Sequence, residues 1–290
     1  VFTQKRYFEA YLWGAAGQLP DESRIFGHEY APGITAGDDI FTVMSSDIFR
    51  GSAFALGYVN PDNLRGMNIW SDMYKVIRKA NLMLARMDEC QDMTALDRRN
   101  YTGYIHFLRG YAYYHILMTC GPAILVGDEI FESNLEGPAY NTYRATYDET
   151  VEYICSELET AAAYLPLKAS IAQFERPTKG AAYALIARLR LHAASPLFNG
   201  TSTARLYFGN WKRTYDKEYY VNPNYSEEKW ALAAAACKRV IDMNVYELFT
   251  VSKDQNTPQL PAGVPTENFP DGAGGIDPFK SYSYMFTGDG

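Results

Sequence analysis

The chain has 290 residues, of which 47% are hydrophobic and 21% are charged, and this composition allows it to bury a sizeable core. Its formal net charge of -7 at pH 7 argues against a nucleic-acid partner, because phosphate binding requires a basic surface. No stretch of the sequence reaches the roughly 20 consecutive apolar residues that span a bilayer. We therefore expect the partner to be a neutral molecule or another protein, with no nucleic acid.

Aromatic residues are unusually frequent: the chain contains 24 Tyr, 15 Phe and 4 Trp. Aromatic rings stack on sugar rings, and they also fill helical cores, so composition leaves both roles open. The cysteines and histidines show no metal-ligand spacing. We expect no metal site and no cofactor, and we expect buried free thiols at Cys90, Cys120, Cys155 and Cys237.

The first predicted element is an amphipathic helix over residues 4–17, which Leu19-Pro20 ends. Its apolar face contains Phe8, Tyr11 and Leu12. Residues 21–65 then lose the helical period and are rich in Gly, Pro, Asp and Phe. This segment is predicted to be a long ordered loop, and long loops in compact proteins are more often functional than idle.

The next two helices are predicted to pack as an antiparallel pair. The first has a buried face with three- or four-residue steps, formed by Trp70, Tyr74, Ile77, Asn81 and Leu84. The second runs from about Ala95 to Cys120 and stops at Gly121-Pro122. Its buried face contains Ile105, Leu108, Ala112 and Ile116.

A second pair follows the loop that ends at Ala145. Thr146 and Glu149 have the spacing of a capping box, and Pro166 ends this helix. Its apolar stripe comprises Val151, Ile154, Leu158 and Leu165. The partner helix is predicted from near Thr178 to Ser195, and its buried residues are Ala182, Leu185, Ile186 and Leu189.

A third pair is predicted to begin at Ser226, which can cap a helix whose N-terminal end favours Glu227 and Glu228. Its predicted buried face comprises Trp230, Ala233, Ala234, Cys237 and Ile241. The three units begin about 80 residues apart, and small alanines beside large aromatic residues are typical of stacked helix pairs. The sequence thus predicts an all-α fold of tetratricopeptide-like helix hairpins with long irregular insertions.

Six blocks, in the same order along the chain, resemble the SusD/RagB family. They include WSDMYKVIRKANLMLARM and YIHFLRGYAYYHILMTCGPAIL, and together they cover residues 1–20, 70–87, 104–125, 145–166, 176–200 and 229–248. The resemblance implies a SusD-like α/α superhelix in a surface-exposed outer-membrane lipoprotein of Bacteroidetes-type bacteria. It also implies glycan capture for polysaccharide utilisation and nutrient uptake through a SusC-like TonB-dependent transporter, with a lipid anchor that is missing from this chain.

The resemblance also suggests how the chain is divided. We expect a single SusD-like helical domain over residues 1–290, truncated at both ends. Within it we expect a ligand-loop insertion at 21–65, three helix hairpin units at 66–250, and the start of a second, loop-rich part at 251–290.

Ligand contacts are predicted in the irregular segments, because a sugar requires an exposed aromatic ring beside amide, carboxylate or guanidinium groups. The family resemblance points to the same two zones, the 21–65 loop and the C-terminal segment. The predicted ligand-binding residues are Asp38, Asp39, Phe49, Arg50, Phe54, Tyr58, Asn60, Phe279, Tyr282 and Tyr284. For each residue alone, anchoring the loop to the helices is an equally good interpretation.

Other aromatic residues have different predicted roles. The regularly spaced Trp70, Tyr74 and Tyr113 are predicted to pack the hairpins together, with Asn81 and Arg109 satisfying buried polar groups. The 197–225 loop carries a further cluster, for which glycan binding, transporter contact and loop packing all stay open. That cluster comprises Tyr207, Phe208, Trp211, Tyr215, Tyr219 and Tyr220.

No catalytic set emerges from the sequence. The adjacent acids Asp38-Asp39 and Asp128-Glu129 have no partner placed across a cleft, and Ser195 lacks the Gly-x-Ser-x-Gly turn of a hydrolase nucleophile. We therefore expect a non-enzymatic glycan-binding protein. A peptide-binding receptor of the RagB kind and a helical-repeat scaffold are the alternatives.

Overall fold

The computed structural model describes residues 2–22, 33–38, 40, 42, 51–60, 62–64, 68–132, 134, 136–140 and 142–287. These residues belong to two compact units, unit 1 (Val1–Asp242) and unit 2 (Met243–Gly290). Asp39, Phe49 and Arg50 lie outside the described residues.

Every regular element in these residues is helical, and other backbone pairing is limited to isolated bridges. The predicted all-α class is therefore confirmed. None of the helices described is both long and apolar enough to cross a membrane. The α-helices of unit 1 are α1 (Lys5–Ala16), α2 (Ser52–Ala55), α3 (Trp70–Arg86), α4 (Ala95–Cys120), α5 (Tyr147–Tyr164), α6 (Lys179–Ala194), α7 (Ser202–Phe208) and α8 (Glu227–Asp242).

Capping boxes fix where two of the long helices begin. At α5, the Glu149 backbone N–H donates to Thr146 Oγ1 over 3.1 Å, and the Thr146 N–H donates to Glu149 Oε2 over 2.6 Å. The capping box predicted there is confirmed. Thr94 and Asp97 make the same reciprocal bonds at α4, where an aspartate takes the position usual for Glu or Gln.

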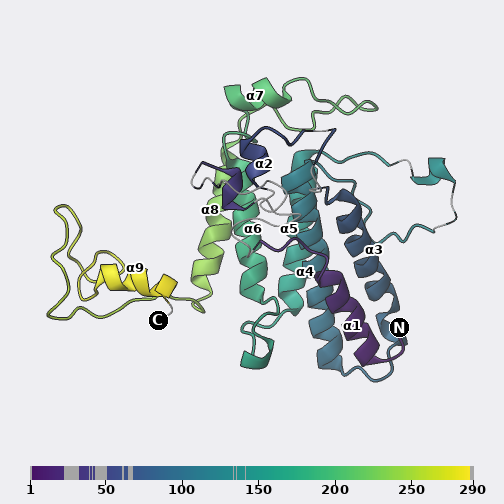
Figure 1. Ribbon diagram of the computed structural model, residues 1–290. Helices are drawn as coiled ribbons and strands as arrows, with labels where there is room; N and C mark the ends of the chain where they lie inside the picture. Colours follow the sequence, from purple (N-terminus) through teal and green to yellow (C-terminus); the bar gives the residue numbers. More distant parts are fainter. Residues whose placement is uncertain are drawn as a thin grey trace. The chain divides into compact units, whose positions relative to one another are not determined.

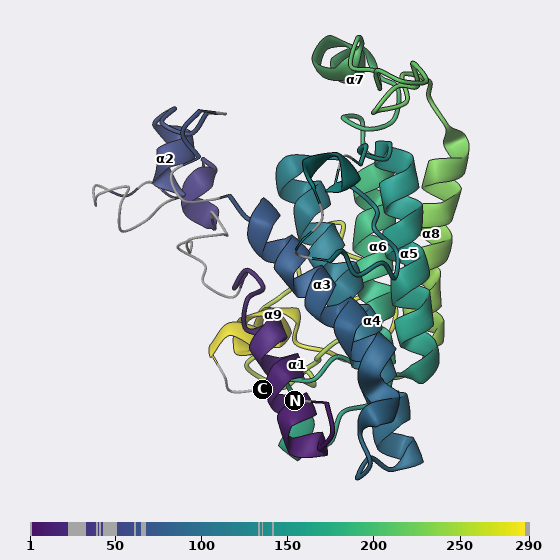
Figure 2. The same cartoon turned by 90° about the vertical axis from the view of Figure 1, so that its right-hand side faces the viewer.

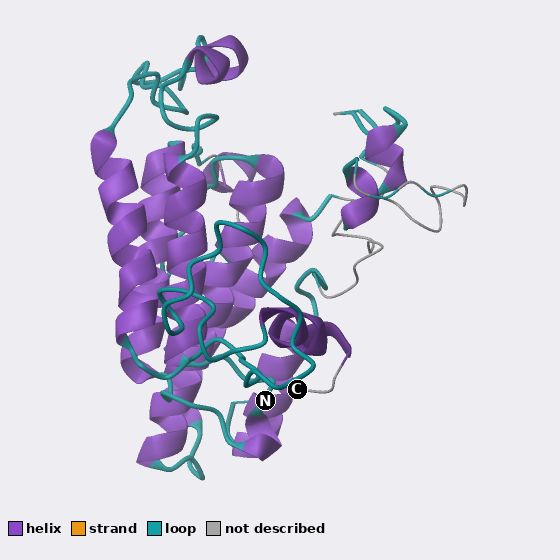
Figure 3. Cartoon of the chain, turned by 90° about the vertical axis from the view of Figure 1, so that its left-hand side faces the viewer, coloured by secondary structure: helices purple, strands orange, loops and turns teal. Residues whose placement is uncertain are grey.

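The long helices of unit 1 lie side by side (Figure 1). α3 packs on α4, α4 on α5, α5 on α6 and α6 on α8, while α1 packs against α3. Figure 2 shows this arrangement from another side, with α3–α4 and α5–α6 as antiparallel hairpins, and Figure 3 shows the bundle of helices from the opposite side. The third predicted unit is represented by α8, since the described residues 243–277 that follow it contain no helix.

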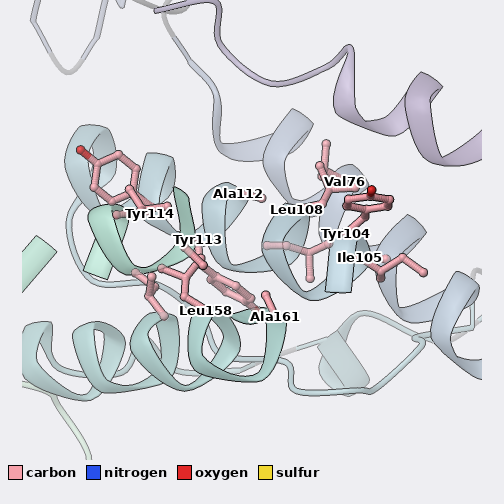
Figure 4. Packing of buried hydrophobic residues seen from close by; sticks show 14 of the residues in the cluster. Val76, Tyr104, Ile105, Leu108, Ala112, Tyr113, Tyr114, Leu158 and Ala161 are labelled. Atoms are coloured by element: carbon pink, nitrogen blue, oxygen red, sulfur yellow. The ribbon is translucent and has the colours of Figure 1, made fainter. Parts of the chain in front are cut away.

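Two glycines let α4 and α5 approach closely. A Cβ atom at Gly110 would lie 3.2 Å from the Glu157 Cβ, and one at Gly103 would lie 3.0 Å from the Leu165 side chain. Both distances are tighter than ordinary van der Waals contact, so larger residues would push the helices apart. Figure 4 shows the core that results, in which Leu108 and Ala112 of α4 lie among other buried side chains.

The predicted buried faces of α4, α5 and α6 are confirmed, since all their residues are buried. In α3 the face is rotated slightly: Met73 and Val76 are fully buried, whereas Trp70, Tyr74 and Leu84 are half-buried. The difference matters because half-buried aromatic rings also face solvent, where they can contact a ligand.

The predicted buried face of α8 is wrong. Of this helix only Ala233 is buried; Trp230 is 40% exposed and Ile241 is 73% exposed, and Ala234 and Cys237 are also exposed. The reason is that α8 is the last helix of the stack in unit 1. Its main helix partner is α6, and Lys229 and Arg239 add ion pairs to Asp148 and Glu159 of α5. Most of its apolar stripe faces away from these contacts. Of the other three cysteines, which were also predicted to be buried free thiols, Cys90 and Cys155 are buried and Cys120 is half-buried.

A buried polar network ties α3, α4 and α5 together. Arg109, 3% exposed, donates two hydrogen bonds of 2.7 Å to the Glu157 carboxylate and one of 2.7 Å to Asn81 Oδ1. Asn81 Nδ2 in turn donates to the carbonyls of Gly127 and Glu129, each over 2.9 Å. The prediction that Asn81 and Arg109 satisfy buried polar groups is confirmed, and their bonds also hold the α4–α5 loop (residues 121–146) in place.

Opposing effects act on the carboxyl of Glu157. Burial raises its pKa, but hydrogen bonds from His106 and Arg109, together with the Arg109 charge, outweigh burial and hold the pKa below its usual range. Glu157 is therefore an ionised partner of Arg109 at neutral pH.

Unit 2 contains one α-helix, α9 (Pro278–Thr287), among its described residues. Asp277 starts this helix, with its Oδ1 accepting from the Lys280 backbone N–H over 2.9 Å and its Oδ2 accepting from Thr257 Oγ1 over 2.9 Å. The Val251 N–H donates to Ser281 Oγ over 2.8 Å. These bonds fasten α9 to the irregular chain that precedes it.

Candidate functional site

The predicted ligand residues of the 21–65 loop that the structure describes are exposed. Asp38 and Asn60 are exposed, Phe54 of α2 is 44% exposed, and Tyr58 is 53% exposed. Asn60 Oδ1 accepts from the backbone N–H groups of Asp62 and Asn63 over 3.0 and 2.9 Å. Asn60 therefore stabilises a turn, whereas the rings of Phe54 and Tyr58 are accessible.

The predicted residues of the C-terminal segment lie on α9. Phe279 is 45% exposed and Tyr282 is 66% exposed, while Tyr284 is half-buried. The ring of Tyr282 lies 5.1 Å from that of Phe286. These residues belong to unit 2 and those of the loop to unit 1, so a joint site formed by both groups stays a prediction.

A site that the sequence reasoning missed lies between α3 and the α4–α5 loop. It is a hollow of about 450 Å³, which we name the α3–loop hollow. Both aromatic rings and hydrogen-bonding groups line it: the lining includes Trp70, Tyr74, Phe131 and Tyr140 together with Ser71, Lys75, Arg78 and Thr142. This mixture of apolar walls and a few polar groups is typical of small-molecule sites.

Hydrogen bonds to the loop backbone hold the wall formed by α3. Tyr74 Oη donates to the Ile124 carbonyl over 2.9 Å and accepts from the Ile124 N–H over 2.7 Å. Burial raises the pKa of Tyr74 well above its usual value, so the phenol stays protonated and both bonds persist. The centre of the Trp70 ring lies 5.0 Å from that of the Tyr74 ring. The Arg144 guanidinium lies over the Trp70 ring, 4.5 Å from its centre.

The opposite wall is formed by the α4–α5 loop. The Phe131 and Tyr140 rings lie 5.9 Å apart, and Tyr140 donates to the Glu132 carbonyl. Arg78 donates to the Phe131 carbonyl, which joins this wall to α3. Helix α3 and the α4–α5 loop thus hold the aromatic rings around an open space.

A second aromatic surface begins at the next residue of the same loop. The Tyr143 and Tyr215 rings lie 4.4 Å apart at 42°, and they are 62% and 51% exposed. We name them the tyrosine pair. Two large exposed rings in mutual contact leave apolar surface in water, which a ligand can cover.

Arg213 anchors the loop that carries Tyr215. It is 8% exposed, donates to Glu149 Oε2 over 2.8 Å and lies 2.7 Å from Asp216 Oδ2. Its guanidinium lies 5.2 Å from the centre of the Tyr215 ring. Arg213 therefore supports the Tyr215 ring in the absence of a ligand, which lowers the entropic cost of binding.

The remaining aromatic residues of the 197–225 loop divide into packed and exposed groups. Phe208 stacks on Phe198 at 5.7 Å and Trp211 lies 4.5 Å from Tyr220, so loop packing explains them. Tyr207 is 68% exposed. Within the described residues, no cluster of His, Cys, Asp or Glu could hold a metal ion.

The signal for these surfaces was present in the sequence but ambiguous. Trp70 and Tyr74 pack against the core as predicted, and the same rings also line the α3–loop hollow. The partners Tyr143 and Tyr215 lie in different loops, and no periodicity relates them.

Comparison with protein families gives one match. Residues 38–191 match the SusD-like family that is described as starch-binding and associating with the outer membrane. No curated protein matches the chain in sequence.

Solved structures resemble the chain in fold. A SusD-like protein from Bacteroides fragilis has a TM-score of 0.60 at 18% identity, and the match covers 87% of this chain and 40% of that one. A SusD homologue from Bacteroides thetaiotaomicron has a TM-score of 0.58 at 21% identity, covering 83% and 41%. A laminarin-binding SusD-like protein has a TM-score of 0.53 at 19% identity, covering 76% and 51%. The matched region thus spans about half the length of these proteins or less.

Proposed function

The chain belongs to the SusD-like family of starch-binding proteins that associate with the outer membrane, and we propose that it binds glycan without cleaving it. Its ligand is an oligosaccharide or polysaccharide held by aromatic stacking and a few hydrogen bonds. Such contacts are weak one by one, so we expect micromolar to millimolar affinity. That range suits a protein that passes its ligand on.

The observation that carries this proposal is the tyrosine pair with its buried Arg213 anchor. The C–H face of a sugar ring packs on exposed aromatic rings, and the tyrosine hydroxyls add hydrogen bonds. The α3–loop hollow lies on the same loop and offers further rings with Ser71, Lys75 and Thr142 at its edge. Together they can contact several sugar units of one chain.

We extend the proposal to the cellular role. The protein acts at the cell surface as a lipoprotein and delivers glycan to a SusC-like TonB-dependent transporter. The support is the family resemblance of the six sequence blocks and the family's association with the outer membrane. The loop residues Asp38, Asp39, Phe49, Arg50, Phe54, Tyr58 and Asn60, with Phe279, Tyr282 and Tyr284, remain part of the proposed ligand surface.

The proposal is tested by affinity gel electrophoresis and calorimetry with starch, laminarin and other polysaccharides. We expect at least one of them to retard the chain, and we expect the double variant Tyr143→Ala/Tyr215→Ala to bind it at least about tenfold more weakly, since each stacked ring contributes about 1 kcal/mol. The control Tyr7→Ala/Tyr164→Ala removes two rings that are 50% and 40% exposed on other surfaces, and it should bind like the parent chain.

Three outcomes contradict the proposal. Retention of peptides with no glycan retained by the gel would assign a different ligand class. If both double variants weaken glycan binding equally, the tyrosine pair is not part of the binding site. Release of reducing ends from a bound glycan would show that the protein is catalytic.

A further inference from the structure

A second hollow lies in unit 1 between α1, α4 and the residues that precede α6. It has a volume of about 530 Å³ and we name it the α1–α4 groove. Its lining includes Trp13, Tyr104, Phe107, Tyr111, Glu175 and Arg176, and it shares no residue with the α3–loop hollow. The volume lies in the range of about 300–1,000 Å³ that is typical of ligand sites.

The packing of α1 explains why this space is open. The main helix partner of α1 is α3, so the α4 face that carries Tyr104, Phe107 and Tyr111 is only partly covered. Trp13 lies 5.6 Å from Tyr104, and Phe107 lies 5.8 Å from Tyr111. Trp13, Phe107 and Tyr111 are half-buried, and each ring is therefore fixed on one side and accessible on the other.

Two charged groups stand at one edge of these rings. The Arg176 guanidinium lies 4.9 Å from the Trp13 ring centre and 6.0 Å from that of Tyr104. Stacking of this kind orients the guanidinium while leaving its N–H edge free to donate. In the described part of the chain neither Arg176 nor the neighbouring Glu175 has an ion-pair partner, so both have hydrogen-bonding capacity left for a ligand.

The charges select among ligand classes. Glu175 would repel an anionic ligand and Arg176 a cationic one, and a purely apolar ligand would desolvate both groups without replacing their bonds to water. A neutral molecule with many hydroxyl groups accepts from Arg176, donates to Glu175 and stacks its C–H face on the rings. A hexose ring combines these properties.

We propose that the α1–α4 groove is a second glycan subsite, which binds neutral hexose units. This inference rests on the proposed glycan-binding function and adds a site and a charge class to it. The tyrosine pair and the α1–α4 groove together let one protein hold either a long glycan at two points or two separate glycan chains.

The test monitors Trp13 directly by NMR of the full chain. The indole N–H signal of Trp13 is assigned by its absence in Trp13→Phe, and maltoheptaose and laminarihexaose are then titrated in. With at least one of these sugars, we expect the Trp13 signal to shift in a saturable way. The shift should persist in Tyr143→Ala/Tyr215→Ala, because that variant lacks only the other surface.

Matched variants then test the charged edge. Arg176→Met and Glu175→Gln should each weaken the binding that shifts Trp13 by about threefold to tenfold, as expected for the loss of one hydrogen bond to a charged group. Arg99→Met, at an exposed arginine elsewhere on α4, should not change it. Glu175 is exposed and Arg176 is half-buried, and neither belongs to the buried hydrophobic cluster.

The outcomes separate this inference from the proposed function. If a sugar binds in a way that depends on the tyrosine pair but the Trp13 signal does not move, the second subsite is wrong and the proposed function stands. If Arg176→Met and Glu175→Gln bind like the parent chain, the charged edge has no role and the subsite is again wrong. If neither sugar nor any polysaccharide binds, both proposals fail.

Discussion

At the scale of single residues, Arg109 links several elements of unit 1. It is 3% exposed and its bonds to Glu157, Asn81 and Asp128 join α4 to α5, α3 and the α4–α5 loop. We predict that Arg109→Met lowers the free energy of unfolding by about 3–5 kcal/mol, because it leaves the Glu157 carboxylate buried without its cation. Urea denaturation at pH 7 measures the effect.

The pH dependence checks this cause. The pKa of Glu157 is depressed in the folded protein, so the ion pair stabilises the parent chain above the ordinary carboxyl pKa of about 4.3 and is lost as pH falls through the folded value. In Arg109→Met, burial favours the neutral acid. The difference in the free energy of unfolding between variant and parent should therefore shrink toward pH 4. A difference that stays constant from pH 7 to pH 4 would exclude the ion pair as its origin. Arg99→Met, at an exposed site, should change stability by less than about 0.5 kcal/mol.

Sequence reasoning identified Arg109 and Asn81 as buried polar residues but not their partners. Helical spacing places both side chains among apolar neighbours, and a buried polar group must find a hydrogen bond. Nothing in the spacing names Glu157, which stands on another helix, or the Gly127 carbonyl in a loop. The same limit applies to the tyrosine pair, since contacts between distant segments depend on how the helices stack.

At the scale of elements, α5 tests how strongly local sequence defines a helix. Its capping box satisfies two backbone groups that would otherwise be unpaired at the helix start. We predict that Thr146→Ala costs about 1 kcal/mol of unfolding free energy, measured by urea denaturation. The control Thr160→Ala removes an exposed hydroxyl that bonds to the Ser156 carbonyl inside the same helix, and it should be close to neutral.

Thr146 also lies in the loop that carries Tyr143, so the cap links stability to the candidate site. Glu149 accepts from both the Thr146 N–H and Arg213, and Arg213 supports Tyr215. If Thr146→Ala lowers the free energy of unfolding no more than Thr160→Ala does, water replaces the capping hydrogen bonds at no cost.

Helices with two neighbours were predicted well, and α8, at the end of the stack, was not. The predicted apolar faces of α4, α5 and α6 are buried because helices cover them on both sides. Residues of α8 have the same periodicity, yet Trp230 and Ile241 are exposed. Periodicity states which face of a helix is apolar, and it does not state whether another element covers that face.

At the scale of the whole molecule, the core of unit 1 accounts for its stability. Its buried residues run from Phe2 to Val221, and Ala236 of α8 is partly buried against them. Among the described residues, none after Asp242 belongs to that cluster. Every helix pair that encloses the core, from α1–α3 to α6–α8, also lies within residues 1–242.

We therefore predict that a chain ending at Asp242 folds with the same α1–α8 core. Stability in a stack of helix pairs comes from contacts between neighbours, and this truncation removes none of those that form the cluster. The midpoint of urea unfolding, followed by circular dichroism, should stay within about 0.3 M of the parent value, since a larger shift would correspond to more than about 0.5 kcal/mol at ordinary denaturant slopes.

A second truncation, after Phe208, removes α8 and Val221 and serves as the comparison, because it strips the covering from α6 and should lower the midpoint clearly. If the truncation after Asp242 lowered the urea midpoint as much as the truncation after Phe208, residues 243–290 would have to stabilise unit 1. The chain would then fold as one cooperative body.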